Sequence, residues 1–126
     1  MGLPSSIGPP SPAFANTCDY GLHCENLVRD DFVRRGFILV AARLPLVFAE
    51  IDLVFLSPQD EIILVEVKSV RAREMIFLPP VKNKQKNRLR KALMRWSEAI
   101  DKTVRLHLAA VNHDGEIITF FDFLAG

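Results

Sequence analysis

Apolar and polar residues recur along the chain with two different periods. Between Asp19 and Arg35 the apolar residues stand three or four positions apart, and Gly36 follows at the position where a left-handed residue ends many helices. The same spacing returns between Val81 and Ile100. Each stretch therefore predicts an amphipathic helix with one apolar face. The apolar positions are Tyr20, Cys24, Leu27, Val28 and Phe32 in the first helix, and Val81, Leu89, Leu93, Trp96 and Ile100 in the second.

Shorter apolar runs outside these helices have the pattern of β-strands. "FILVAAR" (37–43) precedes a proline, and "FAEIDLVFL" (48–56) and "EIILVEVKS" (61–69) flank "SPQD", whose proline suits the second position of a turn. After the second helix, "VRLHLAAV" (104–111) and "EIITFFDFL" (116–124) are separated by "NHDG", which predicts a hairpin or a strand with a trailing extension. The element order is αβββαβ(β).

This order predicts an α/β or α+β fold with a mixed central sheet flanked by helices, in which the strand after the second helix joins by a crossover connection. A chain of 126 residues, 49% hydrophobic and 25% charged, suits one globular domain, which we place at residues 19–126. Residues 1–18 contain four prolines and little to pack, and we expect a flexible arm there. Because the sequence shows neither a membrane-length apolar stretch nor a signal-peptide pattern, we expect a cytoplasmic protein without a membrane partner.

Positive charge is concentrated in one segment. The net charge of the chain is only +1, yet residues 68–95 hold ten Lys and Arg residues against one acid, Glu74. Helices ordinarily interleave acids with their basic residues, so this block favours a phosphate-binding surface over a solvated helix face. We therefore expect a nucleic-acid partner. The basic residues expected to contact it are Arg71, Arg73, Lys82, Lys84, Lys86, Arg88, Arg90, Lys91 and Arg95.

Two carboxylates interrupt the most apolar strands of the chain. Asp52 follows Ile51 in "EIDLVFL", and Glu66 lies within "IILVEVKS". Because side chains alternate along a strand, Ile51 and Leu53 should share one face while Asp52 takes the other. A strand that served only for packing would place its acids at turns or on a solvated face, so these positions require a separate explanation.

The hairpin register brings the two acids together. If the hairpin is centred on its turn, the numbers of partner residues sum to about 118, which sets Asp52 opposite Glu66 and Glu50 opposite Lys68. Like charges that face each other across a ladder repel, and hard cations such as Mg²⁺ or Mn²⁺ prefer carboxylate oxygens. A metal site is one interpretation. The alternative is a solvated sheet face on which Glu50 and Lys68 form a weak surface ion pair.

Four segments together resemble a known family. "GLHCENLVRDDFVRRGFILVAAR", "AEIDLVF", "LVEVKS" and "KNKQKNRLRKAL" follow one another as in the YraN-like family of small bacterial proteins, which belongs to the PD-(D/E)XK, or restriction-endonuclease-like, nuclease superfamily. This combination is far more specific than an "EVK" motif alone, and it covers roughly Tyr20 to the C-terminus. The resemblance implies a restriction-endonuclease-like αβββαβ core, a Mg²⁺ or Mn²⁺ cofactor, and hydrolysis of nucleic-acid phosphodiesters by a homodimer, with branched DNA such as Holliday junctions as a substrate.

The resemblance also implies roles for individual residues. Asp52 and Glu66 would bind the metal, the backbone carbonyl of Val67 would be a further ligand, and Lys68 would orient or activate the attacking water. The alternative function is a non-catalytic nucleic-acid-binding or scaffold module that keeps the nuclease fold. Loss of activity usually shows as a missing acid or lysine, and here Asp52, Glu66 and Lys68 are all present. A protein-interaction domain without nucleic acid would leave the basic block unexplained.

Two further polar residues match the family pattern. Glu25 lies on the flank of the first helix that should face the sheet, where it would contribute to the metal site; the alternative is a surface acid. Gln85 lies on the apolar stripe of the second helix and matches a polar catalytic position of junction-resolving nucleases; the alternative is an amide that caps a strand edge. The chain departs from the family by having Cys24 and Ala49 where glycines usually precede the first-helix glutamate and "EID".

The cysteines and histidines indicate no additional chemistry. Cys18 and Cys24 have a spacing that suits neither a zinc ribbon nor a disulfide framework, so we expect reduced thiols. His107 lies within a strand and His113 within a turn, and both are expected to be structural.

Overall fold

The computed structural model of the chain describes residues 17–47, 50–70 and 81–124. The arm expected at residues 1–18 lies outside these ranges except for its last two residues. Ala49, Arg71 and Arg73 also lie outside them.

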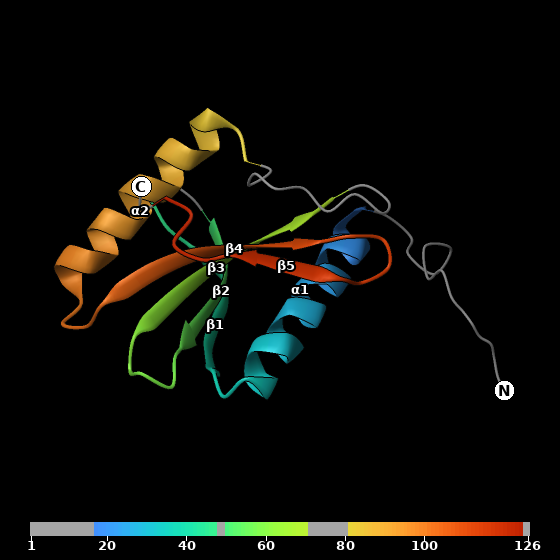
Figure 1. The fold of residues 1–126 in the computed structure, drawn as a ribbon. Coiled ribbons are helices and arrows are strands. Elements are labelled where there is room, and N and C mark those ends of the chain that lie inside the picture. Colours follow the sequence, from blue (N-terminus) through green and yellow to red (C-terminus); the bar gives the residue numbers. More distant parts are fainter. Residues whose placement is uncertain (1–16, 48–49, 71–80, 125–126) are drawn as a thin grey trace, which may run out of the picture.

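A five-stranded mixed sheet forms the centre of the fold, and one helix covers each of its faces (Figure 1). The strands lie in the order β1-β2-β3-β4-β5. This arrangement confirms the expected α+β class and is consistent with a restriction-endonuclease-like core. The elements are α1 (Thr17–Arg34), β1 (Ile38–Pro45), β2 (Glu50–Leu56), β3 (Ile62–Ser69), α2 (Asn83–Ala99), β4 (Val104–Val111) and β5 (Ile117–Phe120).

The strand pairings follow from the lengths of the connections. Neighbours joined by short connections, β1–β2, β2–β3 and β4–β5, are antiparallel. β3 and β4 are parallel, and the segment between them contains α2, as a crossover connection requires. The predicted order, the crossover and the hairpin at "NHDG" are therefore confirmed.

One core cluster lies between α1 and the sheet. The predicted apolar stripe of α1 buries Cys24, Val28 and Phe32 there, and the Phe32 ring stacks on Phe55 with centroids 4.9 Å apart. The helix ends as predicted at Gly36, which adopts φ +94°. Gly36 donates its backbone N–H to the Val33 carbonyl at 3.0 Å, and Phe37 donates to the Phe32 carbonyl at 3.1 Å, which satisfies two carbonyls at the helix end.

A second core cluster lies between α2 and the opposite sheet face. Leu89 of α2 is fully buried there against Val54 and Leu64. Ile51 also belongs to this cluster, whereas Leu53, two positions later, belongs to the cluster under α1. The strict alternation expected for Ile51 and Leu53 is therefore wrong, and the departure falls at Asp52.

No helix in the described ranges is both long and apolar enough to cross a membrane.

Candidate functional site

The pairing of β2 with β3 has the expected register. Leu53 pairs with Val65 and Val54 with Leu64, so the residue numbers sum as predicted and Asp52 and Glu66 occupy the next positions of the two strands. The regular ladder ends at Leu53 and Val65. The two acids therefore lie together where β2 and β3 cease to pair.

The Asp52 carboxylate takes the place of a ladder acceptor. Its Oδ2 accepts a hydrogen bond from the backbone N–H of Val67 at 2.7 Å. In an antiparallel ladder the N–H and C=O of one residue point toward the same neighbouring strand, so the Val67 carbonyl also faces the side of Asp52. These groups are the three ligands that the family resemblance implies: the Asp52 and Glu66 side chains interact with each other, and the Val67 carbonyl faces the Asp52 side of β3.

Glu66 is a buried acid with an incomplete set of partners. Its exposed fraction is 7%, and Gln85 of α2 donates from Nε2 to Glu66 Oε2 at 2.8 Å. Oε1 is buried and accepts no hydrogen bond from the described residues, while the Asp52 side chain lies within hydrogen-bonding reach of the Glu66 carboxyl group. Burial, together with the neighbouring Asp52 carboxylate, raises the pKa of Glu66 to about 8. The site therefore favours a proton or a cation at this carboxylate.

Lys68 follows Glu66 on the same face of β3, and its charge lowers the pKa of Glu66, although by less than burial and Asp52 raise it. The alternative interpretation required an ion pair between Glu50 and Lys68. None of the ion pairs within residues 17–47, 50–70 and 81–124 joins these two side chains.

Glu25 and Arg43 form an ion pair beside the carboxylates. Arg43 Nε lies 3.3 Å from Glu25 Oε1, and the Arg43 and Glu25 side chains are 52% and 15% exposed. Burial and the Asp52 charge raise the pKa of Glu25, while Arg43 lowers it. Glu25 therefore feels the charge of Asp52, but its side chain is held by Arg43.

Sequence reasoning did not find Arg43. It lies between Ala42 and Leu44, whose partners on β2 are Leu53 and Ile51, so its place in the ladder is opposite Asp52. Its backbone φ is +52°, a conformation that non-glycine residues seldom adopt. An arginine at the end of an apolar run carries no pattern that predicts this conformation.

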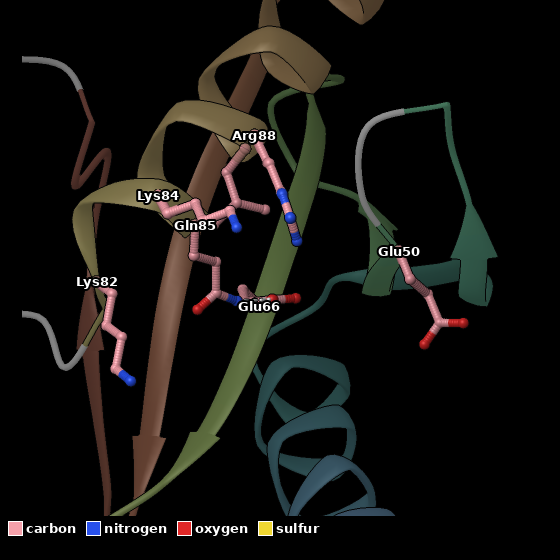
Figure 2. Close-up of a pocket in the computed structure, with 7 residues that line it drawn as sticks. Glu50, Glu66, Lys82, Lys84, Gln85 and Arg88 are labelled. Carbon is pink, nitrogen blue, oxygen red and sulfur yellow. Dashed lines mark hydrogen bonds between the residues drawn. The ribbon is translucent and has the colours of Figure 1, made fainter.

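Cationic side chains of α2 surround a pocket above Glu66. The pocket has a volume of about 300 Å³. Figure 2 shows Gln85 reaching from α2 to Glu66 on β3, with Lys84 and Arg88 on the same helix and Glu50 set apart on β2. Its lining residues are Glu50, Glu66, Lys82, Lys84, Gln85, Arg88 and Leu89. Among the predicted nucleic-acid contacts, the structure thus brings Lys82, Lys84 and Arg88 to the acids.

The remaining described basic residues of the predicted surface lie elsewhere on α2. Arg90, Lys91 and Arg95 are exposed, and Lys86 is half-buried. All four extend the positive charge of the pocket along or around the same helix.

The donor set fits a divalent cation in part. Carboxylate and carbonyl oxygens are the ligands that Mg²⁺ and Mn²⁺ prefer, and Glu66 Oε1 is a buried oxygen that lacks a partner. Within the described segments, however, no three Asp, Glu, His or Cys side chains form a ready-made metal cluster. A cation here would rest on Asp52, Glu66 and the Val67 carbonyl, with Glu25 added only if it leaves Arg43.

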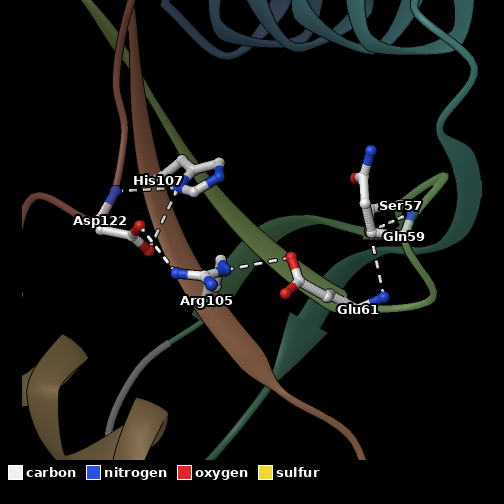
Figure 3. Close-up of polar contacts among 6 residues, drawn as sticks. All are labelled: Ser57, Gln59, Glu61, Arg105, His107 and Asp122. Carbon is white, nitrogen blue, oxygen red and sulfur yellow. Dashed lines mark hydrogen bonds and ion pairs between the residues drawn. The ribbon is translucent and has the colours of Figure 1, made fainter.

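The histidine in β4 has structural contacts. His107 is buried, its Nδ1 accepts the backbone N–H of Asp122 at 3.0 Å, and burial lowers its pKa (Figure 3). Arg105 connects this corner to the start of β3, since it donates to Asp122 and to Glu61, each at 3.0 Å.

The turn between β2 and β3 is held by one buried serine. Ser57 Oγ accepts the backbone N–H groups of Gln59 at 3.2 Å and Glu61 at 3.0 Å (Figure 3). The Ser57 N–H donates to the Glu61 carbonyl at 2.8 Å, and Asp60 adopts φ +64°. These bonds hold the turn between the two strands in one conformation.

The free thiol of Cys24 is buried in the first core cluster, as expected for a reduced cysteine.

Comparison with known proteins places the chain in a family. No curated protein matches it. The model of Uncharacterised protein family UPF0102 matches residues 24–114, a span that runs from α1 to the β4–β5 turn and includes Glu25, Asp52, Glu66, Lys68 and Gln85. Because the match covers more than half of the sequence, the chain belongs to family UPF0102, the YraN family.

Proposed function

We propose that this protein is a metal-dependent nuclease that hydrolyses phosphodiester bonds of nucleic acids. The observation that carries the proposal is Glu66: a buried carboxyl beside Asp52, with one unpartnered oxygen, beneath a pocket lined by Lys82, Lys84 and Arg88. Buried acids with raised pKa values in clefts are frequent at functional sites, and the cationic rim matches a phosphate substrate. Family membership supports a nuclease-like fold.

Asp52, Glu66 and the Val67 carbonyl would hold Mg²⁺ or Mn²⁺. A cation bound there would supply Lewis-acid polarisation of the phosphate and lower the pKa of a bound water. The protein prepares this position through the Val67 N–H, which fixes Asp52, and through Gln85, which fixes one oxygen of Glu66.

Lys68 would act on the attacking water and on the charge that develops at the phosphate. It follows Glu66 on the same face of β3, and its charge lowers the pKa of Glu66, which supports this role. Gln85 would keep the ionised form of Glu66 oriented, because its amide donates to that carboxylate.

The α2 cations would hold the nucleic-acid backbone without reading its sequence, because phosphate contacts carry no direct sequence information. We propose DNA as the substrate, and branched DNA such as Holliday junctions as its form, cut by a homodimer whose two sites act on two strands.

A non-catalytic nucleic-acid-binding module is the second candidate. One observation favours it: no three acidic, histidine or cysteine side chains in the described segments are already assembled around a metal position. The Arg43 ion pair keeps Glu25 from joining Asp52 and Glu66.

A cleavage screen separates the two candidates. Linear duplexes, branched junctions and RNA are incubated with Mn²⁺ or Mg²⁺ and the wild-type protein, with Glu66→Ala as the inactive variant and Glu98→Gln as a matched loss of an exposed acid. The nuclease predicts cleavage by wild type and Glu98→Gln that Glu66→Ala abolishes. Tight binding without cleavage under either ion would favour the module, and cleavage that survives in Glu66→Ala would reject the site.

A further inference from the structure

We call the pocket that contains Glu66 the carboxylate pocket. A second pocket adjoins it along α2. It has a volume of about 250 Å³ and is lined by Leu46, Val47, Ala92, Arg95, Trp96 and Ala99. Residues of α2 line both pockets, with Leu89 in the first and Ala92, about one turn later, in the second. The opposite wall includes Glu50 of β2 in the first pocket and Leu46 and Val47, which follow β1, in the second. They therefore form neighbouring parts of one crease.

The two parts of this crease differ in chemistry. The carboxylate pocket is rimmed by Lys84 and Arg88, whereas the second pocket has an apolar lining with a single charged residue, Arg95. Val47 in its wall is 83% exposed, so this valine presents apolar surface to solvent at the edge of the pocket. We refer to this second pocket as the Trp96 groove.

The charges of α2 lead from one pocket to the other. Lys84, Arg88 and Arg95 are spaced by four and seven residues, so they lie on one side of the helix. At 1.5 Å per residue they span about 16 Å, over which one stacked strand of a duplex carries about five phosphates. A partner that follows this line needs repeated negative charges and, at the Trp96 groove, a flat apolar group.

We propose that the Trp96 groove receives an unpaired base of a nucleic-acid strand whose phosphates follow the α2 cations. The inference rests on the proposed nucleic-acid substrate and adds a preference, among duplex and branched structures, for those that also contain unpaired nucleotides. A single strand combines regular negative charge with planar bases, and proteins that bind it pair a positive groove with aromatic side chains. In a fully paired duplex the bases are stacked inside and do not reach the groove.

The fluorescence of Trp96 tests the groove directly, because Trp96 is the only tryptophan of the chain. The full chain is titrated in chelator with a blunt duplex, with the same duplex carrying an internal unpaired run, and with a single strand. We expect the emission to change with the unpaired and single-stranded probes and to stay nearly constant on the blunt duplex. Equal emission changes with all three would overturn the proposal.

Two variants at the groove and one control test the same point by affinity. Ala99→Leu fills the groove without changing charge, and Val47→Glu places a carboxylate in its wall. Met94→Leu alters an exposed position of α2 outside the groove lining and is the control. Circular dichroism verifies that each variant is folded.

Loss of base stacking should weaken binding of the unpaired probe by about 5- to 150-fold in Ala99→Leu while blunt-duplex affinity is unchanged. Val47→Glu should weaken the unpaired probe more than the blunt duplex, and Met94→Leu should affect neither. If Ala99→Leu alters no affinity, or if Val47→Glu merely converts a dimer into a monomer in sedimentation, the groove is not a base site. Failure of the wild type to bind any probe would instead overturn the proposed nucleic-acid function itself.

Discussion

Replacement of Glu66 by glutamine should make the metal-free protein more stable above neutral pH. Burial, with the Asp52 charge, raises the pKa of Glu66 from 4.5 to about 8. In the unfolded chain this carboxyl loses its proton near the lower value. Between the two values the folded protein binds more protons than the unfolded chain, so its free energy of unfolding falls as pH rises. The contribution that protonated Glu66 makes to the free energy of unfolding is complete below about pH 4.5 and is lost as pH passes about 8.

The size of the effect follows from the shift. At about 1.4 kcal/mol per pKa unit, the difference between the folded and unfolded pKa values of Glu66 corresponds to about 5 kcal/mol of unfolding free energy. This is an upper figure, because the charge repulsion is shared between Asp52 and Glu66. A domain of this size has a total unfolding free energy of about 5 to 15 kcal/mol, so the loss is readily measurable. The glutamine side chain of the variant would stay neutral at every pH and would avoid this loss.

Urea unfolding in chelator across about pH 5 to 8 measures the effect as the difference between wild type and Glu66→Gln. Subtraction removes the opposing contribution of His107, whose lowered pKa costs stability as pH falls below its ordinary value of 6.5. Glu98→Gln, which removes an exposed acid from α2, should parallel the wild type. A difference between wild type and Glu66→Gln that stays constant with pH would refute the reasoning. It would also be refuted if Glu98→Gln differed from the wild type with the same pH dependence as Glu66→Gln.

Three further outcomes are expected. Lys68→Ala should lower cleavage at least about tenfold while binding affinity and its salt dependence stay nearly constant; equal losses of binding and cleavage would make Lys68 a phosphate contact. Lys84→Gln and Arg88→Gln should each reduce the slope of log affinity against log salt by about 0.7 to 0.9, and an unchanged slope would remove that side chain from the binding surface. Gln85→Leu deletes the donor to Glu66, so calorimetry at neutral pH should find Mn²⁺ bound about tenfold more weakly, whereas unchanged affinity would assign Gln85 to packing.

The sequence predicts the placement of the acids because strand pairing obeys simple geometry. One turn and two alternating runs sufficed to bring Asp52 and Glu66 together, and the polar residue on the α2 stripe, Gln85, was found because leucine would ordinarily occupy that position. Two features were not predictable: Ile51 faces α2 although Leu53 faces α1, and the backbone of Arg43 has a positive φ. Both depend on tertiary contacts around the carboxylates, which override local preference and leave no periodic pattern in the sequence.

The turn at Ser57 has a consequence for how this family can vary. Asp52 and Glu66 belong to different strands, and the number of residues in the turn contributes to the register in which they meet. Because side chains alternate along a strand, one inserted or deleted residue in this turn would shift the pairing by one position and rotate Glu66 toward the α1 core. The hydrogen bonds from Gln59 and Glu61 to Ser57 hold a turn of this length in its conformation. The loop contains neither Asp52 nor Glu66, yet changes in its length should therefore be tolerated as poorly as substitution of those two residues.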